Sequence, residues 1–126
     1  MATVLVVDDE IDIKVLFEMC FRREIKHHEL NFVFVFSAEE ALKYMENHQQ
    51  EAVLILSDIN MPGMSGLELL KHIKEKYPKP PPFVMMITAY GDKENHRIAM
   101  ELGADDFLTK PVDFVALKEK LKSKLV

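Results

Sequence analysis

The chain has 126 residues, of which 48% are hydrophobic and 29% are charged, and its formal net charge is -5. The length predicts one domain, residues 1–126, with a single hydrophobic core, and the composition excludes a disordered, collagen-like or disulfide-framed protein. The acidic balance disfavours a nucleic-acid partner, and the apolar runs fall well short of the ~20 residues of a membrane span. The only cysteine, Cys20, is expected to be a small buried hydrophobe in a reducing, cytoplasmic setting.

Five short apolar runs are predicted to be β-strands. They are residues Thr3–Val7, Phe32–Phe36, Val53–Ser57, Phe83–Thr88 and Asp106–Thr109. Apolar residues in these runs are continuous rather than alternating with polar ones, and such strands are typical of a parallel sheet whose two faces are both covered by helices.

A helical pattern follows each predicted strand. The expected N-caps are Ser37, Ser65, Asp92 and Asp113, and Gly103 ends the fourth helix. Apolar residues at helical spacing predict the inward faces: Ile13, Leu16, Phe17 and Cys20; Leu67, Leu70 and Ile73; Ile98 and Leu102; Phe114, Leu117 and Leu121. The alternation of strand and helix, repeated five times, indicates an open α/β sheet with right-handed crossovers.

Three polar segments have other expected roles. Residues 22–31 should end the first helix and cross to the second strand, and residues 79–82, a Lys and three prolines, should form an extended connector. The lysines of the last helix are expected to be solvated charges rather than a nucleic-acid site: Lys118, Lys120, Lys122 and Lys124.

Polar residues that carry chemistry follow the predicted strands. Asp8 and Asp9 come directly after the first strand and Asp58 after the third. Ligands of open parallel sheets bind at the carboxyl ends of the strands, so these acids are expected to converge and to need a compensating positive charge. Oxygen ligands without His or Cys favour Mg2+ or a similar hard ion, and Lys110, after the fifth strand, can add a fixed positive charge. Thr88 ends the fourth strand and brings a hydroxyl to the same edge.

These residues lie in stretches through which the chain resembles the receiver domains of two-component response regulators. The stretches are VLVVDDE at 4–10, LILSDINMPGMSGLELL at 54–70, ITAYGD at 87–92 and GADDFLTKPVD at 103–113. The resemblance covers essentially the full length. It implies a flavodoxin-like, doubly wound sheet of five parallel strands in the order 2-1-3-4-5, with five helices.

The resemblance also implies roles at the acidic edge. Asp58 would be the phosphoacceptor, a nucleophile that takes a phosphoryl group from a kinase phosphohistidine. Asp9 and Asp58 would bind Mg2+ directly, Asp8 through water, and Asn60 through its main-chain carbonyl. Mn2+ or Ca2+ are expected substitutes for Mg2+. Gly63 and Gly66 belong to the turn in which the backbone reverses close to this metal.

The resemblance implies roles for further residues around the phosphoryl group. Lys110 would pair with one phosphoryl oxygen, aimed by a cis peptide before Pro111, and Thr88 would donate its hydroxyl to another. Phe107, where the family more often has tyrosine, would then turn inward, so that the signal is steric; the alternative is that Phe107 belongs permanently to the core. Tyr90 flanks the path of attacking water, with ordinary surface exposure as the alternative.

The expected function is a phosphorylation-activated switch rather than a conventional enzyme, with only self-phosphorylation and slow autodephosphorylation as chemistry. One alternative is a degenerate receiver that only binds proteins. Another is a phosphohydrolase with an aspartyl nucleophile, against which the adjacency of Asp8 and Asp9 counts. Expected partners are a sensor histidine kinase or phosphotransfer protein, and an effector domain or protein on the face formed by the fourth helix, fifth strand and fifth helix. A phosphorylation-dependent homodimer is also expected.

Overall fold

The computed structural model describes residues 2–48, 53–77, 82–89 and 91–125. The strands are β1 (Ala2–Val7), β2 (Leu30–Val35), β3 (Val53–Asp58), β4 (Phe83–Ala89) and β5 (Asp106–Lys110). The helices are α1 (Asp12–Cys20), α2 (Arg22–Lys26), α3 (Ala38–Asn47), α4 (Gly66–Lys76), α5 (Lys93–Glu101) and α6 (Phe114–Leu125). All strand pairs are parallel and the order is β2-β1-β3-β4-β5, so the predicted flavodoxin-like topology is confirmed.

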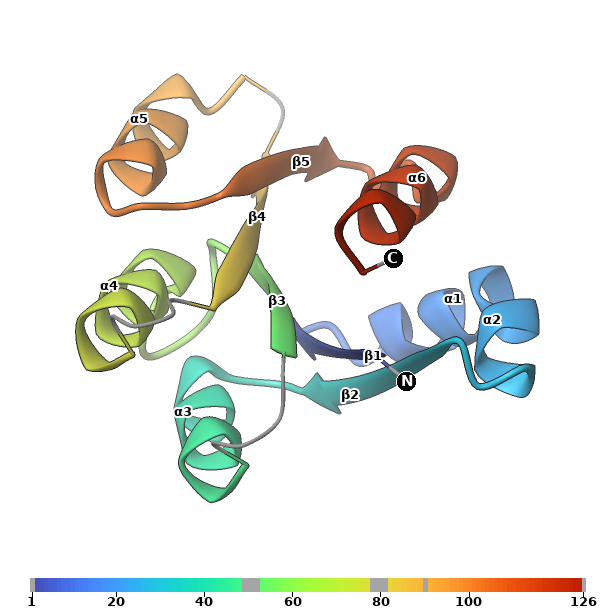
Figure 1. The fold of residues 1–126 in the computed structure, drawn as a ribbon. Helices are drawn as coiled ribbons and strands as arrows, with labels where there is room; N and C mark the ends of the chain where they lie inside the picture. Colours follow the sequence, from blue (N-terminus) through green and yellow to red (C-terminus); the bar gives the residue numbers. More distant parts are fainter. Residues whose placement is uncertain (1, 49–52, 78–81, 90, 126) are drawn as a thin grey trace.

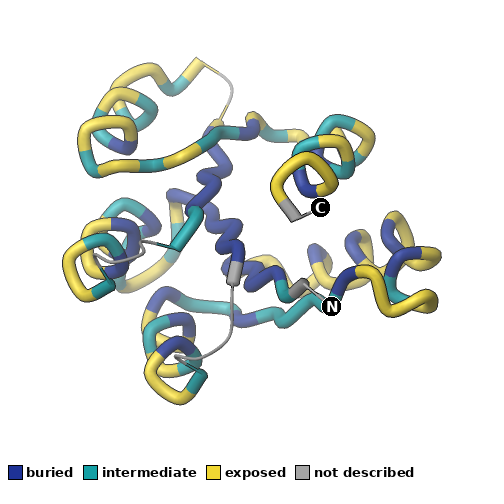
Figure 2. The backbone as a smooth tube through the Cα atoms, viewed as in Figure 1, coloured by how far each residue is buried: buried dark blue, intermediate teal, exposed yellow. Residues whose placement is uncertain are grey.

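The sheet is covered on both faces, as the continuous apolar strands predict. In Figure 1, α1, α2 and α6 lie on one side of the sheet and α3, α4 and α5 on the other. Alternate residues of the central strands point to the two layers: Val4 and Val6 pack with the α1–α6 side, whereas Leu5 and Val7 pack with the α3–α5 side. Figure 2 shows the central strands as the buried spine between helices with exposed outer faces. The edge strand β2 is only half-buried along most of its length.

The predicted helix ends are confirmed. Each expected N-cap side chain accepts a hydrogen bond from a backbone N–H two or three residues further along: Ser37, Ser65, Asp92 and Asp113. Gly103 follows α5 with a φ of +96°, a backbone angle that residues with a Cβ atom rarely adopt. These local signals were sufficient because a cap depends on only a few neighbouring residues.

The predicted number of helices was wrong. Residues 22–31 were expected to be a connector, but Arg22–Lys26 forms the additional helix α2, and β2 begins already at Leu30. Within α2, Glu24 is buried and its Oε2 lies 3.2 Å from Nζ of Lys118 and 3.8 Å from Nζ of Lys122. The partners of Glu24 are almost a hundred residues away in the sequence, so no local pattern could reveal why this polar segment packs as a helix.

Two burial predictions in α1 were also wrong. Ile13 and Phe17 of α1 face the hydrophobic core, as predicted, but Cys20 is exposed and Leu16 is 46% exposed. The inward stripe continues instead to Phe21, one turn after Phe17. The lysines of α6 are at least one-third exposed and also make contacts within the chain: besides the two that reach Glu24, Lys120 pairs with Asp106 at 3.0 Å and Lys124 lies over the Phe83 ring.

Two expectations concern segments that are described only in part. Of the predicted proline connector, residues 79–81 lie outside the described residues, and the carbonyl of Pro82 accepts a hydrogen bond from Nζ of Lys74 at 2.9 Å. Among the helices of the described ranges, none combines the length and the apolar character that crossing a membrane requires.

Candidate functional site

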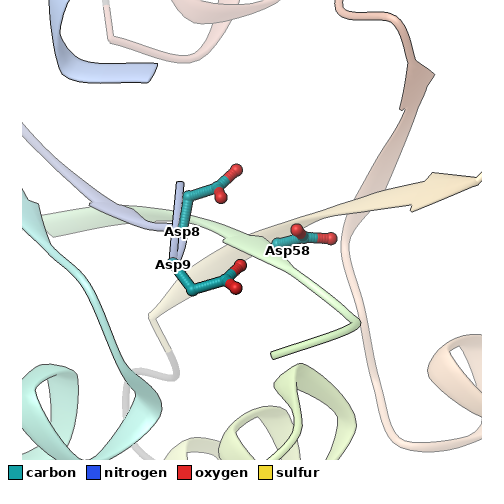
Figure 3. A group of neighbouring side chains, drawn as sticks. All are labelled: Asp8, Asp9 and Asp58. Carbon is teal, nitrogen blue, oxygen red and sulfur yellow. The ribbon is translucent and has the colours of Figure 1, made fainter. Parts of the chain in front are cut away.

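Three aspartates meet at the carboxyl edge of the sheet, as predicted. Asp8 and Asp9 follow β1 and Asp58 ends β3, and one carboxylate oxygen from each lies within 4.8 Å of the others. Figure 3 shows the three side chains grouped at the ends of the two neighbouring strands. Asp8 and Asp58 are buried, being 1% and 4% exposed, whereas Asp9 is exposed. Two of the three carboxylates therefore lie in the protein interior, and the third is exposed to solvent.

The strand order explains why acids fifty residues apart meet. β1 lies between β2 and β3, and its register places Val7 beside Ser57, so the residues that follow these two are neighbours. The turn after Asp58 is equally constrained: Gly66 donates its N–H to the carbonyl of Ile59 at 2.8 Å, and a Cβ at residue 66 would overlap the Asp58 carbonyl oxygen. The close backbone reversal predicted for this turn is confirmed, and Gly63 adopts a φ of +75° within it.

Lys110 brings the positive charge to this cluster. Its Nζ donates a hydrogen bond to Asp58 Oδ2 at 2.7 Å and lies 3.9 Å from Asp8 Oδ2. It also lies 3.5 Å from Oε1 of Glu10, a fourth acid that the sequence analysis did not single out. The Lys110–Pro111 peptide is cis, as the resemblance implied.

The surroundings of the site raise two pKa values, those of Asp8 and Lys110. Burial raises the pKa of Asp8, and the neighbouring charges of Asp58 and Glu10 raise it further, against the lowering effects of a hydrogen bond from the Glu10 N–H and of Lys110. For Lys110, burial alone would lower the pKa, but the hydrogen bond to Asp58 and the surrounding carboxylates together raise it. One lysine thus stays firmly charged while the acids around it remain incompletely compensated.

The donor set fits a hard divalent cation. All three side chains offer carboxylate oxygens, and no His or Cys is part of the cluster found in the described residues. Asp8 Oδ2 is buried and accepts no hydrogen bond from the described part of the chain, which is costly for a carboxylate oxygen unless a cation lies nearby. Asn60 lies two residues after Asp58 and is exposed; the role of its main-chain carbonyl as a ligand stays a prediction.

Thr88 and Phe107 lie on neighbouring strands, β4 and β5. Thr88 is buried, and its hydroxyl donates a long hydrogen bond, 3.4 Å, to the Leu108 carbonyl on β5. Phe107 is only half-buried, and its ring packs against His96 of α5, with 3.9 Å between the ring centroids. The predicted motion of Phe107 stays a prediction, and Tyr90 lies outside the described residues.

Two contributors to the site escaped the sequence analysis for different reasons. Glu10 continues the run of acids begun by Asp8 and Asp9, so its proximity could have been inferred from the sequence. His96 carries no such signal, because its contact with Phe107 depends on how α5 packs over β5.

Comparison with known proteins agrees with this geometry. A sequence model of the family described as the response regulator receiver domain matches residues 4–122. The chain is 37% identical over 121 residues to the response regulator protein PilR of Pseudomonas aeruginosa. This alignment covers 96% of this chain and 25% of that protein. It is 37% identical over 125 residues to the heme response regulator HssR of Staphylococcus saprophyticus, which covers 99% of this chain and 52% of that protein.

A solved structure extends the similarity to three dimensions. The crystal structure of a putative response regulator from Chloroflexus aurantiacus matches with a TM-score of 0.83 at 27% identity, covering 98% of this chain and 97% of that chain. The chain therefore spans about a quarter and about half of the two curated relatives, and nearly all of this solved structure.

Proposed function

This chain belongs to the family of response regulator receiver domains, and from that premise we propose that it is a phosphorylation-activated switch in a two-component phosphorelay. In this proposal Asp58 accepts the phosphoryl group with the help of Mg2+, and residues 1–126 act as one receiver domain rather than as a conventional enzyme. The supporting observation is the cluster of three aspartates, with Nζ of Lys110 2.7 Å from Asp58 Oδ2.

In the proposed reaction a carboxylate oxygen of Asp58 attacks the phosphorus of a phosphohistidine on the donor protein. The O–P bond forms as the P–N bond breaks, the electron pair of the broken bond stays on the imidazole nitrogen, and that nitrogen takes up a proton from water. The product is an acyl phosphate on Asp58. Attack by water later returns the carboxylate and inorganic phosphate, so the only chemistry is self-phosphorylation and slow autodephosphorylation.

Charge neutralisation is the main contribution of the surrounding residues. In our proposal Asp9 and Asp58 would hold Mg2+ directly, Asp8 would hold it through water and Asn60 through its carbonyl, with Mn2+ or Ca2+ as substitutes. When bound, the ion would offset the repulsion between the incoming phosphoryl oxygens and the acids. Lys110 already lies between the acids and is suited to pair with a phosphoryl oxygen as a point charge.

The proposed switch uses Thr88 and Phe107. If the Thr88 hydroxyl donated a hydrogen bond to a phosphoryl oxygen, its long hydrogen bond to the Leu108 carbonyl would break. The hydroxyl would then leave the space that it now occupies between β4 and β5. Phe107 could then leave His96 and turn inward. The half-buried position of Phe107 supports this reading over a ring that belongs permanently to the core.

The same ring lines a groove that is suited to an effector. The groove lies between α5, β5 and α6, has a volume of ≈ 340 Å³, and is lined in part by His96, Phe107 and Pro111. These elements correspond to the fourth helix, fifth strand and fifth helix of the sequence analysis, because α2 adds one to the numbering. We propose that an effector domain or protein, or a second phosphorylated copy, reads this face.

A histidine kinase or phosphotransfer protein is the proposed donor. Ile11 follows Glu10 at the rim of the acidic cluster, and the exposed apolar stripe of α1 continues through Val15 and Met19, which are 55% and 69% exposed. An exposed apolar surface that begins next to Glu10, at the rim of the acidic cluster, supports a protein donor. A cytoplasmic location stays a prediction.

Acetyl phosphate with Mg2+, followed by intact-mass measurement, tests this function. The native chain should gain one phosphoryl group, and Asp58→Asn should gain none. Asp12→Asn, which changes an exposed aspartate outside the cluster, is the matched control and should be phosphorylated normally. No gain in the native chain, with Mg2+ demonstrably bound, would favour a degenerate protein-binding module. Rapid turnover of unrelated phosphoesters would favour a phosphohydrolase.

A further inference from the structure

Glu10 is exposed to solvent, unlike the two buried aspartates of the cluster, Asp8 and Asp58. Its side chain is 67% exposed, whereas those of Asp8 and Asp58 are 1% and 6% exposed. The Glu10 N–H donates a hydrogen bond of 2.9 Å to Asp8 Oδ1, which ties the start of this side chain to the cluster. Glu10 is therefore an acid at the solvent side of the site, attached to its buried part through the backbone.

Lys110 is shared between Glu10 and the buried acids. Its Nζ lies 2.7 Å from Asp58 Oδ2 and 3.5 Å from Glu10 Oε1, and its side chain is one-third exposed. The lysine thus contacts the proposed nucleophile on one side and a solvent-facing carboxylate on the other. A phosphoryl group that bonds to Asp58 must take Lys110 as its partner in competition with Glu10.

We propose that Glu10 is a specificity-determining residue that discriminates among phosphodonors by their negative charge. The proposal rests on Asp58 being the phosphoacceptor. A carboxylate roughly 7 Å from the donor phosphoryl group, in a largely aqueous rim, repels each unit of donor charge enough to slow the reaction about threefold. Glu10 thereby disfavours small polyanionic donors, and a protein donor overcomes the repulsion with contacts that a small molecule lacks.

Two small donors of different charge isolate this effect. Acetyl phosphate is predominantly a dianion at neutral pH, and phosphoramidate carries about one unit less negative charge. The initial rate of Asp58 phosphorylation is measured with each donor by quenched intact-mass time courses at saturating Mg2+ and constant ionic strength. Glu10→Gln removes the charge and keeps the shape of the side chain.

Glu10→Gln should raise the rate with acetyl phosphate about tenfold and the rate with phosphoramidate about threefold, so that their ratio changes about threefold. Glu10→Asp keeps the charge and should keep the native ratio. Glu18→Gln removes the charge of an exposed glutamate in α1, outside the acidic cluster, and should change neither rate. High salt should shrink the difference between the Glu10→Gln variant and the native chain, because the rim is exposed to solvent.

Equal changes with both donors, or none, would overturn the assignment of Glu10, because a residue that only shapes the site cannot distinguish donor charge. Failure of the native chain to accept a phosphoryl group from either donor is a different result. It would refute Asp58 as phosphoacceptor and the role of Glu10 together, whereas phosphorylation with an unchanged ratio refutes Glu10 alone.

Discussion

Buried carboxylates meet lysines at two partly buried places in this molecule, in opposite proportions. At the carboxyl edge, Asp8, Asp58 and Glu10 share the single Lys110. On the α1–α6 side, the single carboxylate of Glu24 faces two lysines of α6; we call this second group, Glu24 with Lys118 and Lys122, the α2–α6 clamp. One place has an excess of acid and the other an excess of base.

The pKa values of Asp8 and Glu24 are shifted in opposite directions at these two places. Burial opposes ionisation of both acids, but the pKa of Asp8 is raised because burial and like charges dominate. In the clamp, burial would raise the pKa of Glu24, yet a hydrogen bond from its own backbone and the contacts with Lys118 and Lys122 lower it overall. The clamp therefore contributes to folding, whereas the acidic edge keeps an unfavourable charge arrangement that a cation and a phosphoryl group can use.

Removing the acid of the clamp should have the largest effect on stability. Glu24→Ala leaves two lysines facing each other and a gap beneath α2, so we expect a loss of about 2–4 kcal/mol in the free energy of unfolding. Urea denaturation measures it. Glu29→Ala, at a nearby exposed glutamate, is the control and should stay within about 0.5 kcal/mol of the native chain. A loss that small for Glu24→Ala would show that the clamp is not needed to hold α2.

Removing an acid from the carboxyl edge should have the opposite sign. Asp8→Asn keeps the shape of the side chain and relieves repulsion, so we expect the free energy of unfolding at pH 7 without divalent ions to rise by about 1–2 kcal/mol. Thermal unfolding measures it. Mg2+ at ten times its dissociation constant should stabilise the native chain by about 1.4 kcal/mol and Asp8→Asn by much less. Destabilisation by Asp8→Asn in the absence of Mg2+ would contradict the unfavourable character of the cluster.

The two places should also respond oppositely to acid. Glu24 has a pKa below the ordinary 4.5, so its contribution is complete above pH 4.5 and is lost as the pH falls through its folded-state pKa. Asp8 has a pKa above the ordinary 3.8, so protonation relieves its repulsion as the pH falls through the raised value, fully by pH 3.8. As the pH falls from 7 to 3, the stability difference of each variant from the native chain should shrink: the loss caused by Glu24→Gln should decrease, and so should the gain caused by Asp8→Asn. Parallel curves, measured by urea denaturation, would contradict the comparison.

Where the sequence analysis succeeded, the relevant physics was local or periodic. Continuous apolar strands predicted the covered parallel sheet, and the N-caps were correct because each involves residues two or three positions apart. The convergence of Asp8, Asp9 and Asp58 was predictable because parallel strands bring their carboxyl ends to one edge.

Where it failed, the deciding contacts were distant in sequence. α2 was missed because Glu24 is polar, and only its pairing with α6 makes burial tolerable. Cys20 was assigned to the core by helical spacing, but α1 is oriented by Phe17 and Phe21, which stack in the aromatic cluster beneath it. Spacing identifies residues that share a face of a helix, and packing decides how far around the helix the buried stripe extends.

The sequence by itself determined the five strands along the chain, a helix after each of them, the helix N-caps and the edge at which the acids meet, because these depend on local preference and on period. Only the tertiary structure decided that Lys110 serves Glu10 as well as Asp58, that Phe107 lies against His96, and that Glu24 is held by α6. Each of these contacts joins segments brought together by packing, and its strength depends on distance and burial in the folded chain.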